Sequence, residues 1–453
     1  MERTRNDRPI DICVIGAGYA GLTAAREIAR AGKEVLVLEA RPRVGGRIWS
    51  IDRRGHRVDV GGAFFGPDQN VIRALACEYD VELHATHARG EHVIAIGNDV
   101  RRYRGLIPRL SPVALLSLSL GMTRVDALAK RVPLEEPWTA RRAAVWDARS
   151  AGDFVARTAV PGVGRDLLDA SVRGLMTCDP SEVSLLHLLQ LVRSAGGLQN
   201  LLAIEGGYQQ DLAVGGAALI AECIAAELGE RVLVNAPVRA IAQHGDEVRV
   251  VSDTREVRAR RVIVATPPAL AARIAFTPAL PLDRIQLGER MLTGSITKFI
   301  VMYDSPFWRG DGASGQSVGV RSPIEMTIDV GPPDGTIGVF AAFAFGPYSN
   351  QLASRTPEQR RSVVIDALTT RFGAQAGEPT DFVEQNWETE EWSHGCSMAH
   401  LGVGALTQFG HALRRPCGRV HWAGTETATV AHGTMDGAAR SGLRAAAEAV
   451  AAL

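Results

Sequence analysis

The chain has 453 residues, of which 46% are hydrophobic and 22% charged, and Lys plus Arg balances Asp plus Glu at 50 each. This length exceeds one ordinary core and predicts two domains, or one domain interrupted by another. The zero net charge argues against a polyanionic partner such as nucleic acid. The six cysteines show no C-x-x-C spacing and no accompanying histidine cluster, so we expect neither a metal site nor a disulfide framework.

The ends of the sequence carry no recognisable targeting segment. Residues 1–9 are charged, and no hydrophobic tail precedes Leu453. The longest apolar stretch, Leu115–Leu120, is short and interrupted by serines, whereas a membrane-spanning helix needs roughly 20 apolar residues. We therefore expect a cytoplasmic protein without membrane contact, and a homodimer follows only from the general frequency of dimers.

The first forty residues predict a dinucleotide-binding βαβ unit. The β-branched run Ile10–Ile15 is typical of a buried strand, and a helix and a second strand follow the glycine loop. In that loop Gly16 permits the tight turn, Gly18 lets a pyrophosphate approach the backbone, and Gly21 lets helix and strand pack closely. The helix N-terminus offers free N–H groups to the phosphates.

Glu39 closes the second strand, 23 residues after Gly16 (39 − 16). This is close to the offset of about 20 residues at which an acid binds the adenosine ribose. The fingerprint then continues through two more glycines and three arginines, as Glu39-Ala40-Arg41-Pro42-Arg43-Val44-Gly45-Gly46-Arg47. Backbone donors and guanidinium groups in this arrangement favour a pyrophosphate ligand.

In this extended fingerprint the chain resembles the flavin-containing amine oxidases, within the two-dinucleotide-binding-domain flavoproteins. The resemblance implies FAD, with Glu39 on the ribose and Arg43 and Arg47 near the phosphates and the flavin. The alternative is that one of these arginines forms only a surface ion pair. The glycine pair Gly61-Gly62 resembles the family segment beside the flavin, although adjacent glycines also mark hairpins. Val238 matches the family position whose backbone holds the adenine.

The block Gly294–Tyr303 resembles the lysine-bearing strand of the family's substrate domain. The family lysine holds a water next to flavin N5, and Lys298 matches it. Strand alternation places Lys298 on the face opposite Phe299 and Val301. A lysine in an apolar strand is costly unless it has a partner or lines a cavity, the alternative being an edge strand whose lysine reaches solvent.

The C-terminal segment carries the most specific resemblance. Arg419–Thr427 is typical of a strand that ends in a glycine turn, and Gly433–Ala438 opens the final helix. The resemblance places the flavin against this turn and helix start. The backbone N–H of Met435 is then the expected donor to the negative charge of the reduced flavin. The implied cofactor contacts in this segment are Gly424, Thr425, Glu426, Thr434 and Met435.

The segment from Trp387 to Ser397 is most similar to the monoamine oxidases, in which a cysteine at the position of Cys396 is bonded to the flavin 8α carbon. The resemblance leaves a covalent thioether and a free buried thiol both open. Two tyrosines that form the family's aromatic cage are here Ser397 and Thr434, although threonine also suits a helix N-cap. Gln209 matches a cavity glutamine, and Tyr208 is either an aromatic wall or a packing residue.

Together these patterns predict an α/β, FAD-binding Rossmann-like domain interleaved with an α+β substrate domain. We assign residues 1–85, 206–285 and 396–453 to the first, and 86–205 and 286–395 to the second, with 86–205 helical. The resemblance implies hydride transfer from an amine to flavin N5, giving an imine, with oxygen reduced to hydrogen peroxide. The alternatives are a dehydrogenase or desaturase of a larger metabolite, or a flavin-binding protein without turnover.

Overall fold

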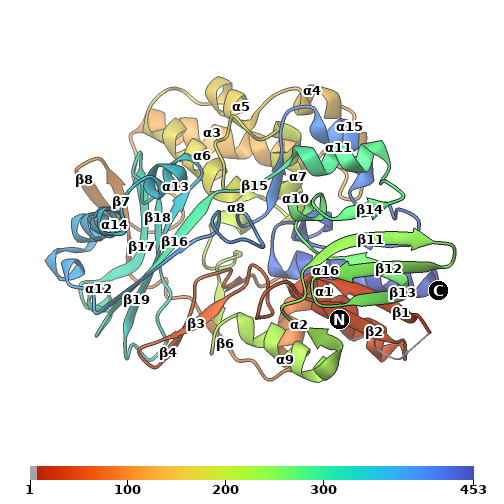
Figure 1. Ribbon diagram of the computed structural model, residues 1–453. Coiled ribbons are helices and arrows are strands. Elements are labelled where there is room, and N and C mark those ends of the chain that lie inside the picture. Colours follow the sequence, from red (N-terminus) through yellow and green to blue (C-terminus); the bar gives the residue numbers. More distant parts are fainter. Residues whose placement is uncertain (1–7) are drawn as a thin grey trace.

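The computed structural model describes residues 8–453 and contains two large sheets joined by a helical layer (Figure 1). Of the charged start, residues 1–7 therefore lie outside the described range. In the first sheet β1 (Ile10–Ile15) pairs in parallel with both β2 (Val35–Leu38) and β13 (Glu256–Val264). The remaining strands of this sheet are β10 (Val232–Leu233), β11 (Val238–His244), β12 (Glu247–Ser252), β14 (Ala275–Thr277) and β22 (Val420–Trp422).

Helices from three parts of the chain pack around this sheet. α1 (Tyr19–Arg30) lies against α16 (Met435–Ala451), so the first and the last helix of the described chain are neighbours. Gly442 allows this approach, because a Cβ there would fall on the carbonyl oxygen of Ala20. α9 (Ala218–Leu228) and α2 (Asn70–Glu78) complete the cover.

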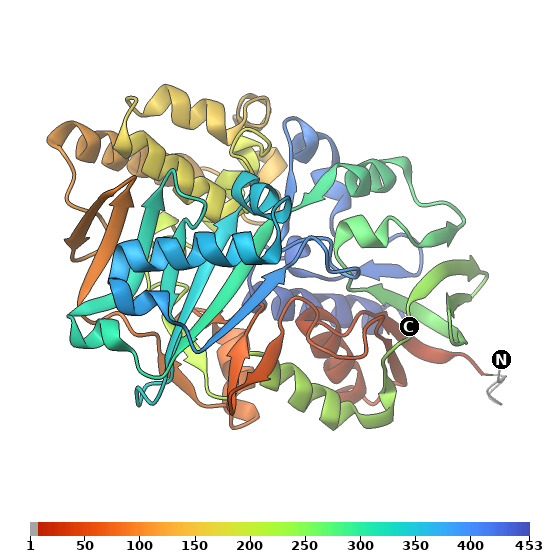
Figure 2. The ribbon, with the colours of Figure 1, turned by 60° about the vertical axis from the view of Figure 1, so that its left-hand side comes forward.

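The second sheet is built from β20 (Asp381–Asn386), β16 (Ile296–Tyr303), β19 (Gly338–Phe345), β18 (Met326–Asp329), β17 (Ala313–Val320), β7 (Glu91–Ile96) and β8 (Asp99–Tyr103), in that order. On one face Phe299 and Val301 pack under α14 (Pro357–Phe372), which crosses the sheet in Figure 2. On the other face Ile300 packs with Trp387 and Cys396, toward the first sheet. The alternation predicted for β16 is therefore confirmed.

A layer of helices closes the remaining side of the molecule. It comprises α3 (Pro112–Ala129), α4 (Ala143–Asp147), α5 (Ala151–Thr158), α6 (Val163–Met176), α7 (Leu185–Ser194) and α8 (Leu198–Leu202). The prediction that 86–205 is helical was wrong at its start, because β7 and β8 join the second sheet there. Their alternating pattern is short, and β17, the strand that pairs with β7, lies more than two hundred residues away in sequence.

Helix α3 is longer than its apolar stretch suggested. Its 18 residues have a mean hydropathy of 1.2, and by length and composition it is the one helix in the described range that could cross a membrane. About a quarter of it, 28%, is buried within the fold. Leu118 and Val125 face the helical core, whereas Val113, Leu116 and Leu120 are exposed.

The shorter elements connect these layers. They are β3 (Ser50–Arg53), β4 (His56–Asp59), β5 (Phe64–Phe65), β6 (Leu83–Ala85), β9 (Asp211–Ala213), β15 (Met291–Thr293), β21 (Ala399–Leu401), α10 (Pro268–Ala271), α11 (Leu282–Arg290), α12 (Phe307–Gly310), α13 (Pro347–Ala353) and α15 (Ala405–Phe409), with 3₁₀ turns at Pro137–Thr139, Gly229–Arg231, Ala374–Gly377, Gly410–Ala412 and Thr425–Thr427. The predicted fold class is confirmed: the first sheet draws on segments 10–38, 232–277 and 420–422. The exact domain boundaries stay a prediction.

Candidate active site at the junction of the two sheets

One elongated cavity begins at the carboxyl ends of the parallel strands of the first sheet and continues toward the second sheet and the helical layer. Ligands of open α/β sheets bind at this edge. Most of the predicted site residues line the cavity: Gly16, Gly18, Glu39, Ala40, Arg41, Gly46, Arg47, Gly62, Tyr208, Gln209, Val238, Cys396, Ser397, Gly424, Thr425, Thr434 and Met435. Six predicted residues do not: Gly21, Arg43, Gly61, Lys298, Trp387 and Glu426.

The glycine loop leaves room for a ligand against the backbone. Gly18 is the N-cap of α1 and provides no side-chain cap, so the first N–H groups of the helix remain available. A Cβ on Gly18 would have no heavy atom nearer than 3.9 Å, and that atom is the carbonyl oxygen of Gly45. A Cβ on Gly21, in contrast, would fall on the carbonyl oxygen of Gly16. The loop therefore fits a pyrophosphate at Gly18, and Gly21 serves helix packing as predicted.

Glu39 is buried at the end of β2, with 3% of its surface exposed. Its Oε2 accepts a hydrogen bond from the backbone of Ala17 at 2.7 Å, and its Oε1 accepts one from Arg41 at 2.9 Å. Each carboxylate oxygen keeps a second lone pair. The carboxylate thus holds two loops together and can still accept hydrogen bonds from ribose hydroxyls.

The three arginines of the fingerprint have different surroundings. Arg41 lines the cavity and donates to Glu390 and Ser393, at 3.1 and 2.8 Å. The prediction that Arg43 lies near the phosphates was wrong. Its guanidinium donates to the carbonyl of Gly46 at 3.0 Å and lies 4.4 Å from the centre of the Trp49 ring. Arg43 therefore shapes the loop from behind, because the five donors of its fork match closely spaced carbonyls.

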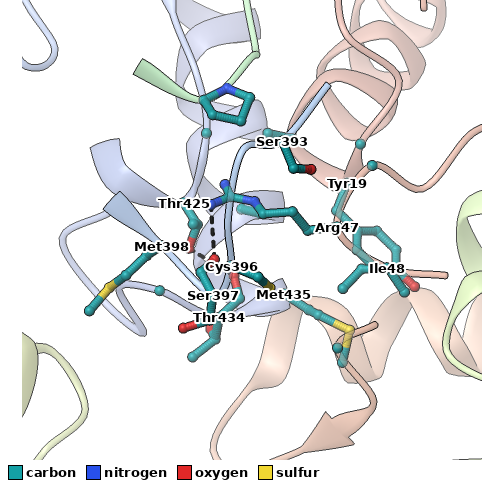
Figure 3. A pocket seen from close by; sticks show the side chains of 18 of the residues that line it. Tyr19, Arg47, Ile48, Ser393, Cys396, Ser397, Met398, Thr425, Thr434 and Met435 are labelled. Atoms are coloured by element: carbon teal, nitrogen blue, oxygen red, sulfur yellow. Dashed lines mark hydrogen bonds between the residues drawn. The ribbon is translucent and has the colours of Figure 1, made fainter. Parts of the chain in front are cut away.

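Arg47 extends over one end of the cavity, beside Cys396, Ser397 and Thr425 (Figure 3). We call this the flavin end, because the family resemblance places the flavin there. It makes a two-point ion pair with Glu426, at 2.6 and 3.1 Å, and donates to the carbonyl of Ser397 at 2.9 Å. Glu426 lies behind Arg47 and not on the cavity. Its predicted direct contact with the cofactor is thus corrected to a contact with Arg47.

Lys298 lies beneath the cavity on the interior strand β16, between β19 and β20. It is 3% exposed, and its Nζ donates to the carbonyl of Gly61 at 3.0 Å. The edge-strand alternative is therefore wrong. Burial lowers the pKa of Lys298 to about 8, although the nearby carboxylate of Asp59 opposes this shift. A lysine of this kind can hold or release a proton near neutral pH.

Trp387 and Gly61 also support the cavity from behind. The indole Nε1 of Trp387 donates to the carbonyl of Val60 at 3.0 Å, one residue before the carbonyl that Lys298 binds. A Cβ on Gly61 would fall on the carbonyl oxygen of Arg47. Gly61 is thus a point of close chain approach and not a surface for a ligand. The sequence predicted that Trp387 and Gly61 contact the cofactor. In the structure neither lines the cavity, and both instead fix the chain segment that leads to Gly62.

The start of α16 closes the flavin end of the cavity. Thr434 is its N-cap, because Oγ1 accepts a hydrogen bond from Gly437 at 3.1 Å. Asp436, in the first turn of α16, accepts hydrogen bonds from the backbone N–H groups of Val71 and Ile72. It thereby caps the start of helix α2. Within residues 8–453 the N–H of Met435 has no acceptor. This free donor at a helix N-terminus suits the charge of a reduced flavin.

Cys396 lines the same end of the cavity and is 8% exposed. Burial raises the pKa of its thiol to about 11, while Arg47 and Lys298 both act to lower it. Figure 3 shows Cys396 and Ser397 beside the side chain of Arg47, with Thr434 and Met435 below them. The thiol is thus placed at the cavity wall, with two cations able to favour its ionised form.

The far end of the cavity is mostly apolar. It is lined by Phe64, Leu175, Leu191, Leu201, Tyr208 and Met398, together with Gln69, Gln209 and His432. Gln209 donates to the carbonyl of Leu201 at 3.1 Å, but its Oε1 and the Oε1 of Gln69 are buried without a partner. Buried amide oxygens normally accept a hydrogen bond, so these two suit the N–H groups of a ligand.

Sequence reasoning missed most of this far end. Leu175, Leu191 and Leu201 lie on α6, α7 and α8, where they follow an ordinary core pattern. Trp392 and Ser393 also line the cavity, and in sequence they lie between the predicted residues Trp387 and Cys396. Only this closeness to Cys396 could have indicated them. Among the lining residues the single carboxylate is Glu39, at the nucleotide end.

Comparison with known proteins gives a consistent result. A family model described as flavin containing amine oxidoreductase matches residues 19–450. AofH of Mycobacterium tuberculosis, named as a flavin-containing monoamine oxidase, is 41% identical over 444 residues, which are 98% of this chain and 97% of that protein.

Two solved structures are also similar over the whole chain. A putrescine oxidase bound to putrescine has a TM-score of 0.95 at 29% identity, and covers 98% of this chain and 99% of its own. The cyclohexylamine oxidase from Brevibacterium oxydans has a TM-score of 0.94 at 32% identity, again covering 98% of this chain and 99% of its own.

Proposed function

The chain belongs to the family of flavin-containing amine oxidoreductases, and from this we propose that it oxidises monoamines with an apolar substituent. Membership establishes FAD as the cofactor and amine oxidation as the chemistry. The substrate class is our proposal. It rests on one observation: the far end of the cavity is apolar, with two unpartnered amide oxygens and no carboxylate.

A diamine would bring a second ammonium into this space. Burying an unpaired charge is costly, and the carboxylate of Glu39 is at the opposite end of the cavity. A cycloalkyl or alkyl group would instead contact Leu175, Leu201 and Tyr208. The absence of tyrosines at Ser397 and Thr434 leaves space beside the flavin for a bulky group, in contrast with the aromatic cage of the family pattern.

The residues proposed to hold FAD divide by part of the cofactor. Glu39 would bind the ribose, the N–H groups after Gly18 the pyrophosphate, and the backbone of Val238 the adenine edge. The N–H of Met435 would face the flavin ring, with Arg47 and Thr425 beside it. FAD supplies the two-electron acceptor when bound.

The chain's own residues then act on the amine. The apolar wall excludes water and lowers the pKa of the bound ammonium, so the amine loses its proton to solvent before reaction. Gln69 and Gln209 orient the N–H groups. When bound, FAD would accept the α-hydrogen together with the electron pair of the broken C–H bond. The substrate would then be an iminium ion, which loses an N–H proton to solvent and leaves as the imine. Oxygen accepts the two electrons with two protons and becomes hydrogen peroxide. Lys298 would provide a proton donor near that reaction.

Anaerobic mixing tests the substrate class directly. We expect cyclohexylamine and medium-length alkylamines to bleach the flavin at least about a hundredfold faster than putrescine, because an unpaired buried ammonium costs several kcal/mol. A Gln209→Leu variant should raise KM for the preferred amine. Gln243→Leu, on strand β11 and outside the cavity, is the control. Faster bleaching by putrescine would overturn the substrate class. Bleaching by no amine, with slow reoxidation in air, would favour the desaturase alternative.

The sequence expectations on location and partners also remain proposals. We propose a cytoplasmic protein without a nucleic-acid or membrane partner, and a homodimer as the assembly to test. The exposed apolar side of α3, with Val113, Leu116 and Leu120, is the feature that challenges this proposal. Cell fractionation tests the proposed location. Recovery of the protein in the membrane fraction would contradict it, if the Leu116→Ser variant is no longer found in that fraction.

A further inference from the structure

A second group of ligand-type side chains lies outside the cavity, where the loop after α6 meets β21. The Sγ of Cys178, a carboxylate oxygen of Glu182 and a ring nitrogen of His400 all lie within 4.8 Å of one another. None of the three lines the cavity described above. They come from positions 222 residues apart (400 − 178), which is why the cysteine spacing along the sequence gave no indication of a site.

The backbone holds the two segments together. The N–H of Ser184 donates to the carbonyl of Leu401 at 2.9 Å, and the N–H of Leu401 donates to Nδ1 of His187 at 2.8 Å. These bonds fix β21 against the start of α7. A tight turn precedes them, in which the N–H of Glu182 donates to the carbonyl of Asp179 at 2.9 Å. Cys178 and His400 are therefore placed by main-chain contacts that need no ligand.

His400 is the observation that points to a ligand. It is 3% exposed, and neither of its ring nitrogens has a hydrogen-bond partner. Within the described residues the Sγ of Cys178 has no hydrogen bond either. A buried imidazole ordinarily donates at one nitrogen and accepts at the other, so two unpartnered nitrogens are a destabilising arrangement.

The surrounding charge favours a cation. The charged groups that interact with the thiol of Cys178 are both negative, namely the carboxylates of Glu182 and Asp179. A divalent cation at this point would reverse the penalty on the thiolate, because it supplies the missing positive charge.

We propose that Cys178, Glu182 and His400 bind one zinc ion, with water at the fourth position. One sulfur, one nitrogen and one oxygen ligand form a set that suits zinc, which prefers four tetrahedral ligands. Bonds of about 2.0–2.3 Å put such ligand atoms about 3.5 Å apart, so the side chains close by about 1 Å on binding. The S–H bond of Cys178 breaks, its proton goes to solvent, and a sulfur–zinc bond forms without electron transfer.

The ion would join the helical layer to the wall of the cavity. β21 begins at Ala399, directly after Cys396, Ser397 and Met398, which all line the cavity. Glu182 is exposed, so the ion can enter from the surface. We expect zinc to raise the midpoint of thermal unfolding, because it binds only the folded chain.

Cobalt titration of the FAD-containing, chelator-treated full-length protein tests this site. We expect one equivalent of Co²⁺ to bind with a thiolate-to-cobalt charge-transfer band, seen as a difference from the flavin spectrum. Cys178→Ser and His400→Phe should abolish the band. Glu182→Gln should weaken binding at least about tenfold, the lower bound for loss of a group that supports a metal. Cys77→Ser removes an exposed cysteine and should leave the titration unchanged.

Several outcomes would overturn the proposal. They are an absence of cobalt binding, a band that survives Cys178→Ser, or a band that disappears in Cys77→Ser. Far-ultraviolet circular dichroism and the flavin spectrum establish that each variant is folded. If a variant with a buried substitution does not fold, the exposed Glu182→Gln variant decides: zinc must raise the unfolding midpoint of the parent protein more than that of Glu182→Gln.

Discussion

The ammonium group of Lys298 donates a hydrogen bond to the main-chain carbonyl of Gly61, 3.0 Å away. This bond joins strand β16 of the second sheet to the glycine segment of the cofactor domain. Trp387 makes a parallel bond to the carbonyl of Val60, so two side chains from one sheet hold one short segment. The segment ends at Gly62, which lines the cavity, and the relative position of cavity and sheet thus depends on both bonds.

Replacement of Lys298 should act mainly on the step that uses oxygen. We expect Lys298→Met to lower the rate constant for reoxidation of the reduced enzyme by about a hundredfold, the usual cost of one lost electrostatic donor. Flavin reduction by the amine should change much less. Stopped-flow measurement of the two half-reactions separates these effects. Lys298→Arg is the matched control that keeps the charge, and equal losses in both half-reactions would contradict the assigned role.

The buried lysine also predicts a pH dependence of stability. Burial lowers its pKa from 10.5 to about 8, so between these values the unfolded chain binds the proton and the folded chain has released it. Stability of the parent protein relative to Lys298→Met should therefore rise with pH across this window, by up to about 3 kcal/mol. Chemical unfolding of both proteins at several pH values measures the difference. A difference that stays constant or falls would show that the lysine is charged throughout.

The buried ion pair between Arg47 and Glu426 should contribute more to the free energy of unfolding than the exposed ion pairs do. Glu426→Gln leaves a guanidinium without its carboxylate in a site where Glu426 is 2% exposed. We expect a loss of about 3 kcal/mol in unfolding free energy, together with a lower FAD content. The control is Asp381→Asn, which breaks the more exposed pair with Arg53 and should cost at most about 1 kcal/mol. Similar losses in the two variants would contradict this ranking.

Cys396 decides whether the cofactor is covalent. After acid denaturation of the yellow protein, flavin that remains with the precipitate and is released in Cys396→Ala would establish a thioether. We expect this result because Cys396 lines the cavity beside Arg47, at the end where the flavin would lie. Cys417→Ala, a buried cysteine outside the cavity, is the control. Flavin that leaves the parent protein as free FAD would exclude the bond.

The nucleotide end of the site could be predicted because its determinants are local in sequence. Gly16, Gly18 and Glu39 act within one βαβ unit, and the spacing of the unit fixes their geometry. The contacts of Arg43 could not be predicted, since an arginine that binds backbone carbonyls and one that binds phosphate have the same sequence pattern.

The substrate wall was missed for a different reason. Leu175, Leu191 and Leu201 belong to three helices whose packing alone decides which leucine faces the cavity. The pairing of β7 with β17 likewise depends on a contact between distant segments, so a local pattern could not indicate it.

Two glycines of the first loop should respond in opposite ways to the same substitution. Gly18 has φ −77°, and an added Cβ would meet its nearest neighbour at 3.9 Å, so Gly18→Ala should fold with nearly unchanged stability. The methyl group would occupy the space meant for the pyrophosphate, and FAD affinity should fall by about a hundredfold, or about 3 kcal/mol. Gly21→Ala should lose stability itself, because its Cβ would collide with the Gly16 carbonyl that cannot move without distorting the turn. Thermal unfolding without FAD and fluorescence titration with FAD separate the two effects. Full FAD affinity in Gly18→Ala would place the pyrophosphate elsewhere in the cavity.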